Sequence, residues 1–487
     1  MAAVVTDQFR LSNASNFVDS VNSADNSYYV YLGTPSPTSP SVGFGRTSDW
    51  NTNVPSPTDN LQYAGFYKKN ILFGKKVNSA NIRRVIRKVT WTVNNRYDMY
   101  RHDYSITNPT PNSNSSRLYD CNYYVMNSDF RVYVCIDNGS SGTNTKGNNS
   151  QDEPTFTNLA PSAAGTSGDG YVWKYLFSVS PSDIIKFDST VQNNQIKKVY
   201  IDNAGSGYSA GTVDILGDGS GGRVSISVDS AGAITGATVT AGGQGYTFGI
   251  VDLGSLQPQG SIPNPAKLIP IIPPSRGHGY DVYTELGTDK VLIYARFDAS
   301  TKDFPIDTSF AQVGILKNPQ ELSSTNLYSE SQFSALFAIK LADDFAGTPV
   351  IGAEMTQTRT DGNVAKGFVA SYDSETKVLK YFQDRALYFG NEKDQTDYDS
   401  VTTDSTIYAF ESSSSTITPF SGSINTSFDG STVTVGSKLI DLGVTFTDGL
   451  ANPEINNKTG DLIYIDNRPS VTRDIRQKED VKIILEF

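Results

Sequence analysis

The chain has 487 residues, more than one ordinary hydrophobic core holds, and its 37% hydrophobic and 19% charged residues exclude an intrinsically disordered protein. Its 51 acidic and 40 basic residues give a net charge of −11, which does not favour nucleic acid as a partner. Frequent Tyr, Phe, Ser, Thr, Asn and Gly residues favour strands and turns over helices. We therefore expect an all-β protein of several domains, with no signal peptide and no membrane-spanning segment.

The first sixty residues contain few predicted elements. Strands are expected at residues 3–6 and 28–32. A helix that Ser12 caps is expected between them, with Phe17, Val18 and Val21 on its apolar side. Five prolines between residues 35 and 57 predict a long surface loop.

Residues 68–101 are strongly basic and contain a predicted strand, 85–93, that carries Trp91. Basic side chains interleaved with aromatic ones are typical of surfaces that bind a phosphate backbone. A surface that docks on an acidic protein and a solvated strand face are the alternatives, and in so acidic a chain we favour these two. The candidate docking patch consists of Lys68, Lys69, Lys75, Lys76, Arg83, Arg84, Arg87 and Lys88.

The two cysteines lie close together in the sequence. Strands are predicted at residues 122–126 and 130–136, joined by a hairpin-like turn at 127–129. Cys121 and Cys135 flank strand-like sequence, and two cysteines cannot form a disulfide framework. We expect two reduced, buried thiols, although the two side chains could face each other across the strand pair.

The most informative stretch is Gly168–Phe177. Gly168, Asp169 and Gly170 have the composition of a tight turn. Large aromatic residues then occupy every second position, which is the period of one strand face, and Val172, Lys174 and Leu176 take the other face. The stretch therefore predicts a central strand with apolar residues on both faces. Its aromatic residues are Tyr171, Trp173, Tyr175 and Phe177.

This stretch resembles the signature strand of a T4-type bacteriophage baseplate wedge subunit, the all-β wedge component that forms a homodimer. The C-terminal segments 461–470, with Asn467, Arg468 and Pro469, and 481–487 are similar to the closing segment of that family. Three more blocks fit in the same order, at residues 4–10, 132–137 and 310–319. The resemblance covers about residues 1–196, 262–325 and 450–487.

The resemblance implies a structural protein of the virion tail baseplate, assembled in the host cytoplasm. The family role is to bind the larger wedge proteins during assembly and to remain in the baseplate while it rearranges. No enzymatic activity, catalytic residue, cofactor, metal or membrane is implied, and the expected partners are a second copy and other wedge proteins. We expect a discontinuous β-sandwich core, 1–196, 261–325 and 451–487, interrupted by β-rich insertions at 197–260 and 326–450.

The first insertion contains an internal repeat. Residues 203–209, Asn-Ala-Gly-Ser-Gly-Tyr-Ser, recur 38 residues later as Ala-Gly-Gly-Gln-Gly-Tyr-Thr at 241–247. Strands are predicted at 212–216, 223–228 and 234–239, so one small β unit is used twice. The glycine-rich turn 217–222 lacks the Lys-Ser/Thr of a phosphate loop. The spacing of Asp214, Asp218 and Asp229 matches no standard calcium loop, so ordinary turns are expected.

Two later segments have side chains that suggest chemistry. His278 and Asp281 suggest a catalytic or metal site, but the only other histidine is His102, so we favour a structural role for His278. An acidic run at 392–404 could supply the paired carboxylates that cleave a glycosidic bond. It is the basis of an alternative function for the chain, a host-glycan-binding or glycan-cleaving tail protein. A solvated loop is the interpretation we favour for that run, whose members are Glu392, Asp394, Asp397, Asp399 and Asp404.

The remaining predicted elements are a strand at 290–297 and, in the second insertion, a helix at 331–341 and two hairpins. One hairpin joins strands 367–372 and 377–382. The other joins 423–428 and 432–435 around Asp429-Gly430, a dipeptide typical of type I′ turns.

Overall fold

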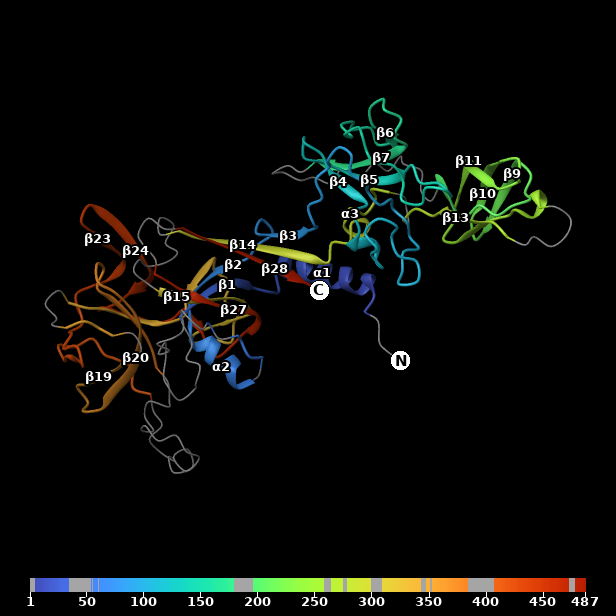
Figure 1. Ribbon diagram of the computed structural model, residues 1–487. Coiled ribbons are helices and arrows are strands. Elements are labelled where there is room, and N and C mark those ends of the chain that lie inside the picture. The colour runs from blue at the N-terminus through green and yellow to red at the C-terminus, as the bar shows by residue number, and fades with distance from the viewer. Residues whose placement is uncertain are drawn as a thin grey trace. The chain divides into compact units, whose positions relative to one another are not determined.

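The computed structural model describes residues 5–34, 54, 56–59, 61–178, 196–257, 264–274, 278–298, 309–342, 347–350, 353–383, 407–472 and 478–487. Strands account for 45% of it and helices for 8%, so the predicted all-β class is confirmed. The chain forms two compact units, one of Met1–Ala14, Arg84–Lys290 and Phe487 and the other of Ser15–Arg83 and Val291–Glu486 (Figure 1). None of the helices in the described part of the chain is long and apolar enough to cross a membrane.

A four-stranded antiparallel sheet is built around the predicted aromatic strand in the first unit. Its strands, in spatial order, are β4 (Tyr124–Met126), β5 (Arg131–Asn138), β7 (Tyr171–Ser178) and β6 (Ser162–Ala163). β4 and β5 form the predicted hairpin, with Met126 opposite Val132. β7 lies between β5 and β6, so its predicted interior position is confirmed.

The repeat in the first unit folds into a small closed module. Its strands are β8 (Lys198–Asn203), β9 (Gly211–Gly217), β10 (Ser220–Val228), β11 (Ile234–Gln244), β12 (Gly249–Val251) and β13 (Lys267–Ile271). β11, β10, β9 and β12 form one sheet and β13 and β8 another. β8 also lies beside β11 and β12 beside β13, so the six strands close around one apolar interior.

The two halves of this module are related by the repeat. β8, β9 and β10 of the first half correspond to β11, β12 and β13 of the second. β9 lies beside β10 as β12 lies beside β13, and β10 lies beside β11 as β13 lies beside β8. Tyr208 and Tyr246 are both buried in the shared interior. Asp214 and Asp252 are equivalent residues of the two halves, and the Asp252 amide donates to the Asp214 carbonyl at 3.0 Å. β13 belongs to this module although it lies beyond residue 260, and the proposed domain limits stay a prediction.

The second unit contains several sheets. A five-stranded sheet has the order β17 (Gln332–Ser334), β2 (Ile71–Lys76), β1 (Tyr28–Gly33), β15 (Ser309–Lys317) and β27 (Asp461–Thr472). A six-stranded sheet has the order β22 (Ile417–Thr418), β19 (Glu354–Thr358), β20 (Val364–Asp373), β21 (Val378–Phe382), β18 (Phe337–Lys340) and β25 (Leu450–Ala451). A three-stranded sheet has the order β28 (Lys478–Glu486), β14 (Lys290–Asp298) and β3 (Ile82–Val85). Two further sheets consist of two strands each. One pairs β16 (Gln320–Glu321) with β26 (Ile455–Asn456), and the other pairs β23 (Gly430–Val435) with β24 (Lys438–Phe446).

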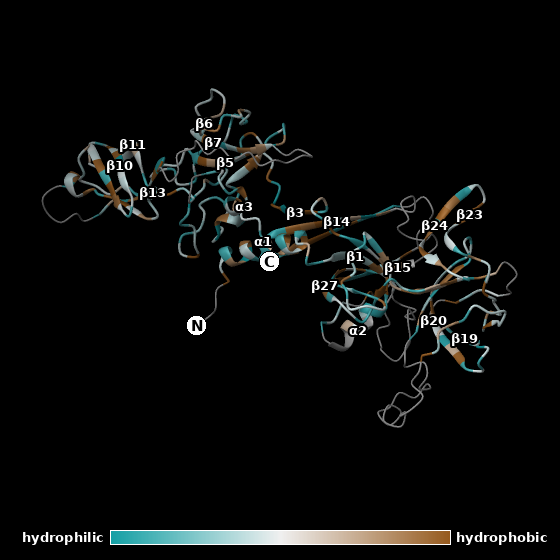
Figure 2. Cartoon of the chain, turned by 180° about the vertical axis from the view of Figure 1, so that it is seen from behind, coloured by the Kyte–Doolittle hydropathy of each residue, from teal (hydrophilic) through white to brown (hydrophobic). Residues whose placement is uncertain are grey.

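Hydrophobic residues are concentrated along the interior strands, as on β10 and β14 (Figure 2). The predicted strands 28–32 and 290–297 are confirmed as β1 and β14, and the hairpin at 367–382 as β20 and β21. The family-like segments 310–319, 461–470 and 481–487 fall largely on β15, β27 and β28.

Helices are few and short in the part of the chain that the structure describes. They are α1 (Asp7–Asn22), α2 (Leu61–Lys69) and α3 (Val282–Glu285), with single turns η1 (Leu118–Asp120) and η2 (Gly254–Leu256). The predicted first helix exists but begins before Ser12, because Thr6 accepts hydrogen bonds from the amides of Phe9 and Arg10. Val5 and Thr6, predicted to be in a strand, are irregular, and residues 3 and 4 lie outside the described residues.

Three other predicted elements are wrong. Residues 86–93 form no strand beyond a single bridge at Thr90, since their backbone meets β4 only around Met126. Residues 331–341 form β17 and β18, not a helix, because both segments pair with existing strands. Residues 423–428 are not a strand, since β23 pairs with β24 around Gly436.

Candidate functional site

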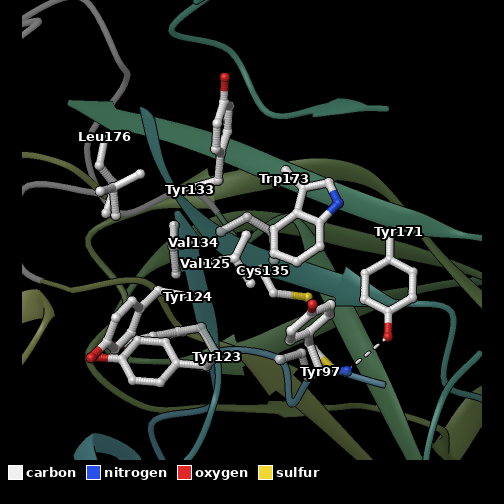
Figure 3. Packing of buried hydrophobic residues seen from close by; sticks show 14 of the residues in the cluster. Tyr97, Tyr123, Tyr124, Val125, Tyr133, Val134, Cys135, Tyr171, Trp173 and Leu176 are labelled. Atoms are coloured by element: carbon white, nitrogen blue, oxygen red, sulfur yellow. Dashed lines mark hydrogen bonds between the residues drawn. The ribbon is translucent and has the colours of Figure 1, made fainter. Parts of the chain in front are cut away.

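Tyr171 and Trp173 of β7 belong to the buried hydrophobic cluster of the first unit (Figure 3). Trp173 is fully buried, its ring stacked on Tyr171 with centroids 5.3 Å apart. The edge of Tyr97 meets the Trp173 ring at 5.7 Å. Aromatic pairs in these arrangements add stabilisation beyond the area they bury. Tyr97 lies outside every predicted element, so the sequence pattern gave no signal for its place in this cluster.

Hydrogen bonds fix the orientation of Tyr171. Its hydroxyl accepts a bond from the Tyr97 amide at 3.0 Å, drawn as a dashed line in Figure 3, and donates to the Asn148 carbonyl at 2.8 Å. One buried side chain thus joins β7 to two irregular segments. Burial raises the pKa of Tyr171, so the hydroxyl remains a donor at physiological pH.

The turn before β7 has the backbone its composition predicts. Gly168 and Gly170 have φ values of 69° and 84°, in the left-handed region that glycine tolerates. Asp169 Oδ1 accepts from the Tyr171 amide at 2.9 Å and Oδ2 from the Gln151 amide at 2.8 Å. Each carboxylate oxygen therefore accepts one backbone hydrogen bond, and together the two bonds connect the start of β7 to the preceding loop.

The opposite face of β7 is also covered. Lys174 is 2% exposed, and its ammonium donates to the Leu159 carbonyl. Leu176 on this face is also buried, whereas Tyr175 and Phe177, on the face of Trp173, are half-buried near the strand end. Both faces are thus covered around Trp173, as expected for an interior strand.

The two cysteines are free and buried, as predicted. The Cys121 thiol donates to the Leu118 carbonyl at 2.9 Å. Burial raises the pKa of both thiols, which keeps them protonated and unreactive.

In the C-terminal signature, Asn467 faces inward and Arg468 and Pro469 are exposed. The Gln312 side-chain amide donates to Asn467 Oδ1 at 3.0 Å within the five-stranded sheet. Arg468 Nε lies 2.5 Å from Asp466 Oδ2. The pairing of β27 with β15 skips residues between Asn467 and Val471, so Arg468 and Pro469 lie on a bulge at the sheet edge.

The candidate basic patch does not form one surface within either unit. Lys68 to Arg83 belong to the second unit and Arg84, Arg87 and Lys88 to the first. Lys68 and Lys69 end α2, whereas Lys75 and Lys76 donate to the carbonyls of Arg296 and Ser329 at 2.9 and 2.7 Å.

The arginines of this set also bind backbone oxygens. Arg83 donates to the Ser79 carbonyl at 2.6 Å, Arg84 to Thr288 at 3.1 Å and Arg87 to Cys121 at 2.9 Å. These bonds hold loops and strand ends in place. Because the guanidinium groups already bind backbone carbonyls, the geometry favours a structural role for these arginines over contacts with phosphate groups.

His278 belongs to a partly buried polar arrangement that fixes a short loop. Its Nδ1 lies 2.6 Å from Glu285 Oε1, and Glu285 Oε2 accepts from the Gly279 amide at 2.6 Å. The Tyr100 ring meets the imidazole edge-on at 4.7 Å. Asp281 is used elsewhere, as the cap of α3, where it accepts from the Thr284 amide at 3.1 Å. The geometry supports the structural role predicted for His278, and Glu285 was not foreseen.

The three aspartates of the repeat module that could suggest a calcium site take part in turns or in a surface ion pair. Asp218 accepts from the amides of Thr247 and Phe248, and Asp229 from those of Ala231 and Ala233. Asp214 pairs with Arg223 at 2.9 Å. No group of three or more His, Cys, Asp or Glu side chains within the described ranges is arranged to hold a metal ion. The acidic run 392–404 lies outside those ranges.

No protein-family model matches this chain, and no curated protein matches it.

Proposed function

We propose that the chain is a structural virion protein, a baseplate wedge subunit of a contractile phage tail that links wedge components during assembly. The observation that carries the proposal is Gly168–Phe177, whose family-like sequence forms an interior strand of an all-β core. The second family-like region, β27, lies at a sheet edge with Arg468 and Pro469 exposed. An edge strand of this kind is a suitable contact surface for a neighbouring subunit.

The chemistry of the other candidate residues fits this role. His278, Asp169, Asp218 and the arginines of the basic set all bind groups of their own fold. Rigid loops and broad preformed surfaces are what a permanent assembly protein needs. The proposed partners are a second copy of the chain and the other wedge proteins, and the proposed location is the tail baseplate.

Reconstitution tests the proposal. The full chain is mixed with the other wedge proteins of its own phage and analysed by size-exclusion chromatography with light scattering. We expect a homodimer that enters a larger complex. A monomer that binds none of these proteins would overturn the proposal.

Two matched variants test the contribution of β27. Arg468→Glu and Arg223→Glu each reverse the charge of an exposed arginine that is paired with an aspartate, 67% and 57% exposed respectively. Arg468 lies in a family-like segment and Arg223 in the repeat module, which has no family counterpart. We expect Arg468→Glu to weaken complex formation and Arg223→Glu to leave it unchanged. Equal behaviour of the two variants would remove β27 from the proposed interface.

A further inference from the structure

A buried lysine lies where two sheets of the second unit meet. Lys380 belongs to β21 of the six-stranded sheet and is 1% exposed. Its ammonium nitrogen lies 3.8 Å from the centre of the Phe73 ring and 3.4 Å from Ser334 Oγ. Phe73 and Ser334 belong to β2 and β17 of the five-stranded sheet, so this one side chain contacts both neighbouring strands of the other sheet.

The surroundings of Lys380 are poor for a charged group. A protonated amine has three donors. Within the described part of the chain, the Lys380 amine meets one neutral hydroxyl at long hydrogen-bond distance and one aromatic face. A buried ammonium needs paired charge and short hydrogen bonds to offset its desolvation. The site therefore accommodates the neutral amine better than the cation. Consistently, burial lowers the pKa of Lys380 to about 7.

The face of the Phe73 ring and one carboxylate act against this effect, because both attract the protonated amine. Glu454 Oε2 accepts a hydrogen bond from the Ser334 amide at 2.7 Å, and the Glu454 amide donates to the Ser334 carbonyl at 2.9 Å. Its negative charge favours the protonated form of Lys380, although burial exceeds this attraction, and burial also raises the pKa of Glu454. Beyond Glu454 lie Glu330 and the hydroxyl groups of Tyr29 and Tyr328. The opposing residue on β18 is Ala338, which adds no charge.

The chain itself crosses the junction at this point. β17 ends at Ser334 in the five-stranded sheet, and β18 begins at Phe337 in the six-stranded sheet. The Ala335 amide between them donates to the Leu72 carbonyl at 3.0 Å. A charge placed beside Ser334 thus acts on the short connection that leads from β17 to β18.

We propose that Lys380 makes this junction acid-sensitive: the uncharged amine lets the two sheets close on each other, and its protonation loosens them. Opening the junction exposes the amine to water, where a lysine keeps its proton up to a pH of about 10.4. Closing the junction therefore releases a proton between about pH 7 and pH 10, so rising pH favours the closed form. Below about pH 7 both forms hold the proton, and this group adds no further pH dependence.

Hydrogen–deuterium exchange of the full chain tests the proposal, with rates corrected for the intrinsic effect of pH. The peptides of interest cover β2, β17 and β21. In the wild type, the opening equilibrium constant of these peptides should fall by up to tenfold per pH unit between about pH 7.5 and 9.5. Lys380→Met should remove this dependence. Lys366→Met, which changes a lysine that is 32% exposed on the neighbouring strand β20, should retain it.

The proposal would be overturned if the opening constants of the wild type did not change with pH. It would also be overturned if the opening constants of Lys380→Met fell with rising pH as they do in the wild type. Should Lys380→Met fail to fold, a 13C spectrum of wild-type protein labelled at lysine Cε decides the matter. One lysine must then titrate near neutral pH, and titration of all lysines near pH 10 would overturn the proposal. Glu454→Gln removes the attraction that favours the cation and should move the midpoint to lower pH; an unchanged or higher midpoint would contradict the arrangement described.

Discussion

Tyr171 and Trp173 share one face of β7 but stabilise the core by different interactions. Tyr171 makes two hydrogen bonds through its hydroxyl, to the Tyr97 amide and the Asn148 carbonyl. Trp173 Nε1 is buried and has no hydrogen-bond partner among the described residues. The indole therefore acts through packing, whereas the phenol also fixes two loops. Sequence periodicity predicted the common face of both residues but not this difference, which depends on backbone groups of irregular segments.

Replacement of Trp173 tests its packing role. Trp173→Ala leaves a cavity in a fully buried position and should cost about 3–5 kcal/mol of unfolding free energy, with a sharp loss of soluble protein. Trp173→Phe retains an aromatic ring and loses no hydrogen bond, so it should cost distinctly less. Chemical denaturation of the purified variants measures both. An alanine variant with unchanged stability that fails only in assembly would make Trp173 an interface residue.

Tyr171→Phe tests the hydrogen bonds alone. The substitution keeps the ring stacked on Trp173 but leaves the Tyr97 amide without its acceptor, and an orphaned buried donor costs about 1–3 kcal/mol. We expect a destabilisation in this range together with faster amide exchange at Tyr97. Tyr175→Phe is the matched control, because the Tyr175 hydroxyl bonds to the Ser178 hydroxyl at an exposed position. Equal effects of the two variants would contradict the role assigned to the Tyr171 hydroxyl.

At the scale of elements, local patterns predicted the strands that carry strong alternation or clear turns. The hairpin of β4 and β5, the strand β7 and the paired strands β20 and β21 are examples. Residues 331–341 show why other elements were missed. Their apolar residues fit a helical stripe as well as two short strands, and pairing with β2 and β21 decides for strands. Asp429-Gly430 is a stronger hairpin signal than Gly436-Ser437, yet β23 and β24 pair around the latter turn.

Two glycines of the repeat differ in the space around their Cα atoms. Gly243 and Gly245 have φ values of 61° and 79°, so either alanine variant is strained by about 1–2 kcal/mol. A Cβ at Gly243 would also lie 2.6 Å from the Gly222 amide nitrogen and the Ser220 carbonyl oxygen, whereas one at Gly245 meets its nearest atom at 3.9 Å. Gly243→Ala should therefore destabilise the module clearly more than Gly245→Ala. Amide exchange over residues 211–251 measures the difference, and equal losses would contradict the packing described.

The pairing of β14 with β28 includes an exposed charged contact that predicts a response to acid. Arg296 binds both carboxylate oxygens of Asp480, at 2.6 and 3.0 Å, and the Tyr294 hydroxyl donates to one of them at 2.8 Å. These bonds lower the pKa of Asp480 to about 2. The contact therefore stabilises the fold above an ordinary aspartate pKa of about 3.9 and loses this effect as the pH falls toward 2.

Asp480→Asn should remove this acid dependence and have a small effect at pH 7, because both side chains are about half exposed. Acid titration followed by amide exchange in β14 and β28 measures it. Asp466→Asn is the control on another strand, since its partner Arg468 belongs to β27. Retention of the full acid dependence of β14 and β28 in Asp480→Asn would exclude the contact as its source.

At the scale of the whole molecule, partners far apart in the sequence decide the architecture. The Ile196 amide donates to the Gly242 carbonyl, and β8 pairs with β13, so closure of the repeat module joins its first and last segments. β1 pairs with β15, nearly three hundred residues away. The repeat indicated that one unit is used twice, but nothing local specifies which strands of the two copies meet. For the same reason the charge pattern of segment 68–101 predicts one basic surface, although the segment divides between two units.

The two units should respond separately to core substitutions, because each has its own apolar clusters. Trp173 belongs to a cluster of the first unit and the strand of Lys380 to the sheets of the second. Substitutions without shared partners are usually additive, and their effects remain local when the units open separately. Trp173→Ala should thus accelerate amide exchange in β5 and β7 and leave β20 and β21 unchanged, whereas Lys380→Met should change exchange in the second unit only. Exchange that rises together in both units after Trp173→Ala would mean that they unfold as one cooperative body, since a common opening step exposes every strand at the same rate.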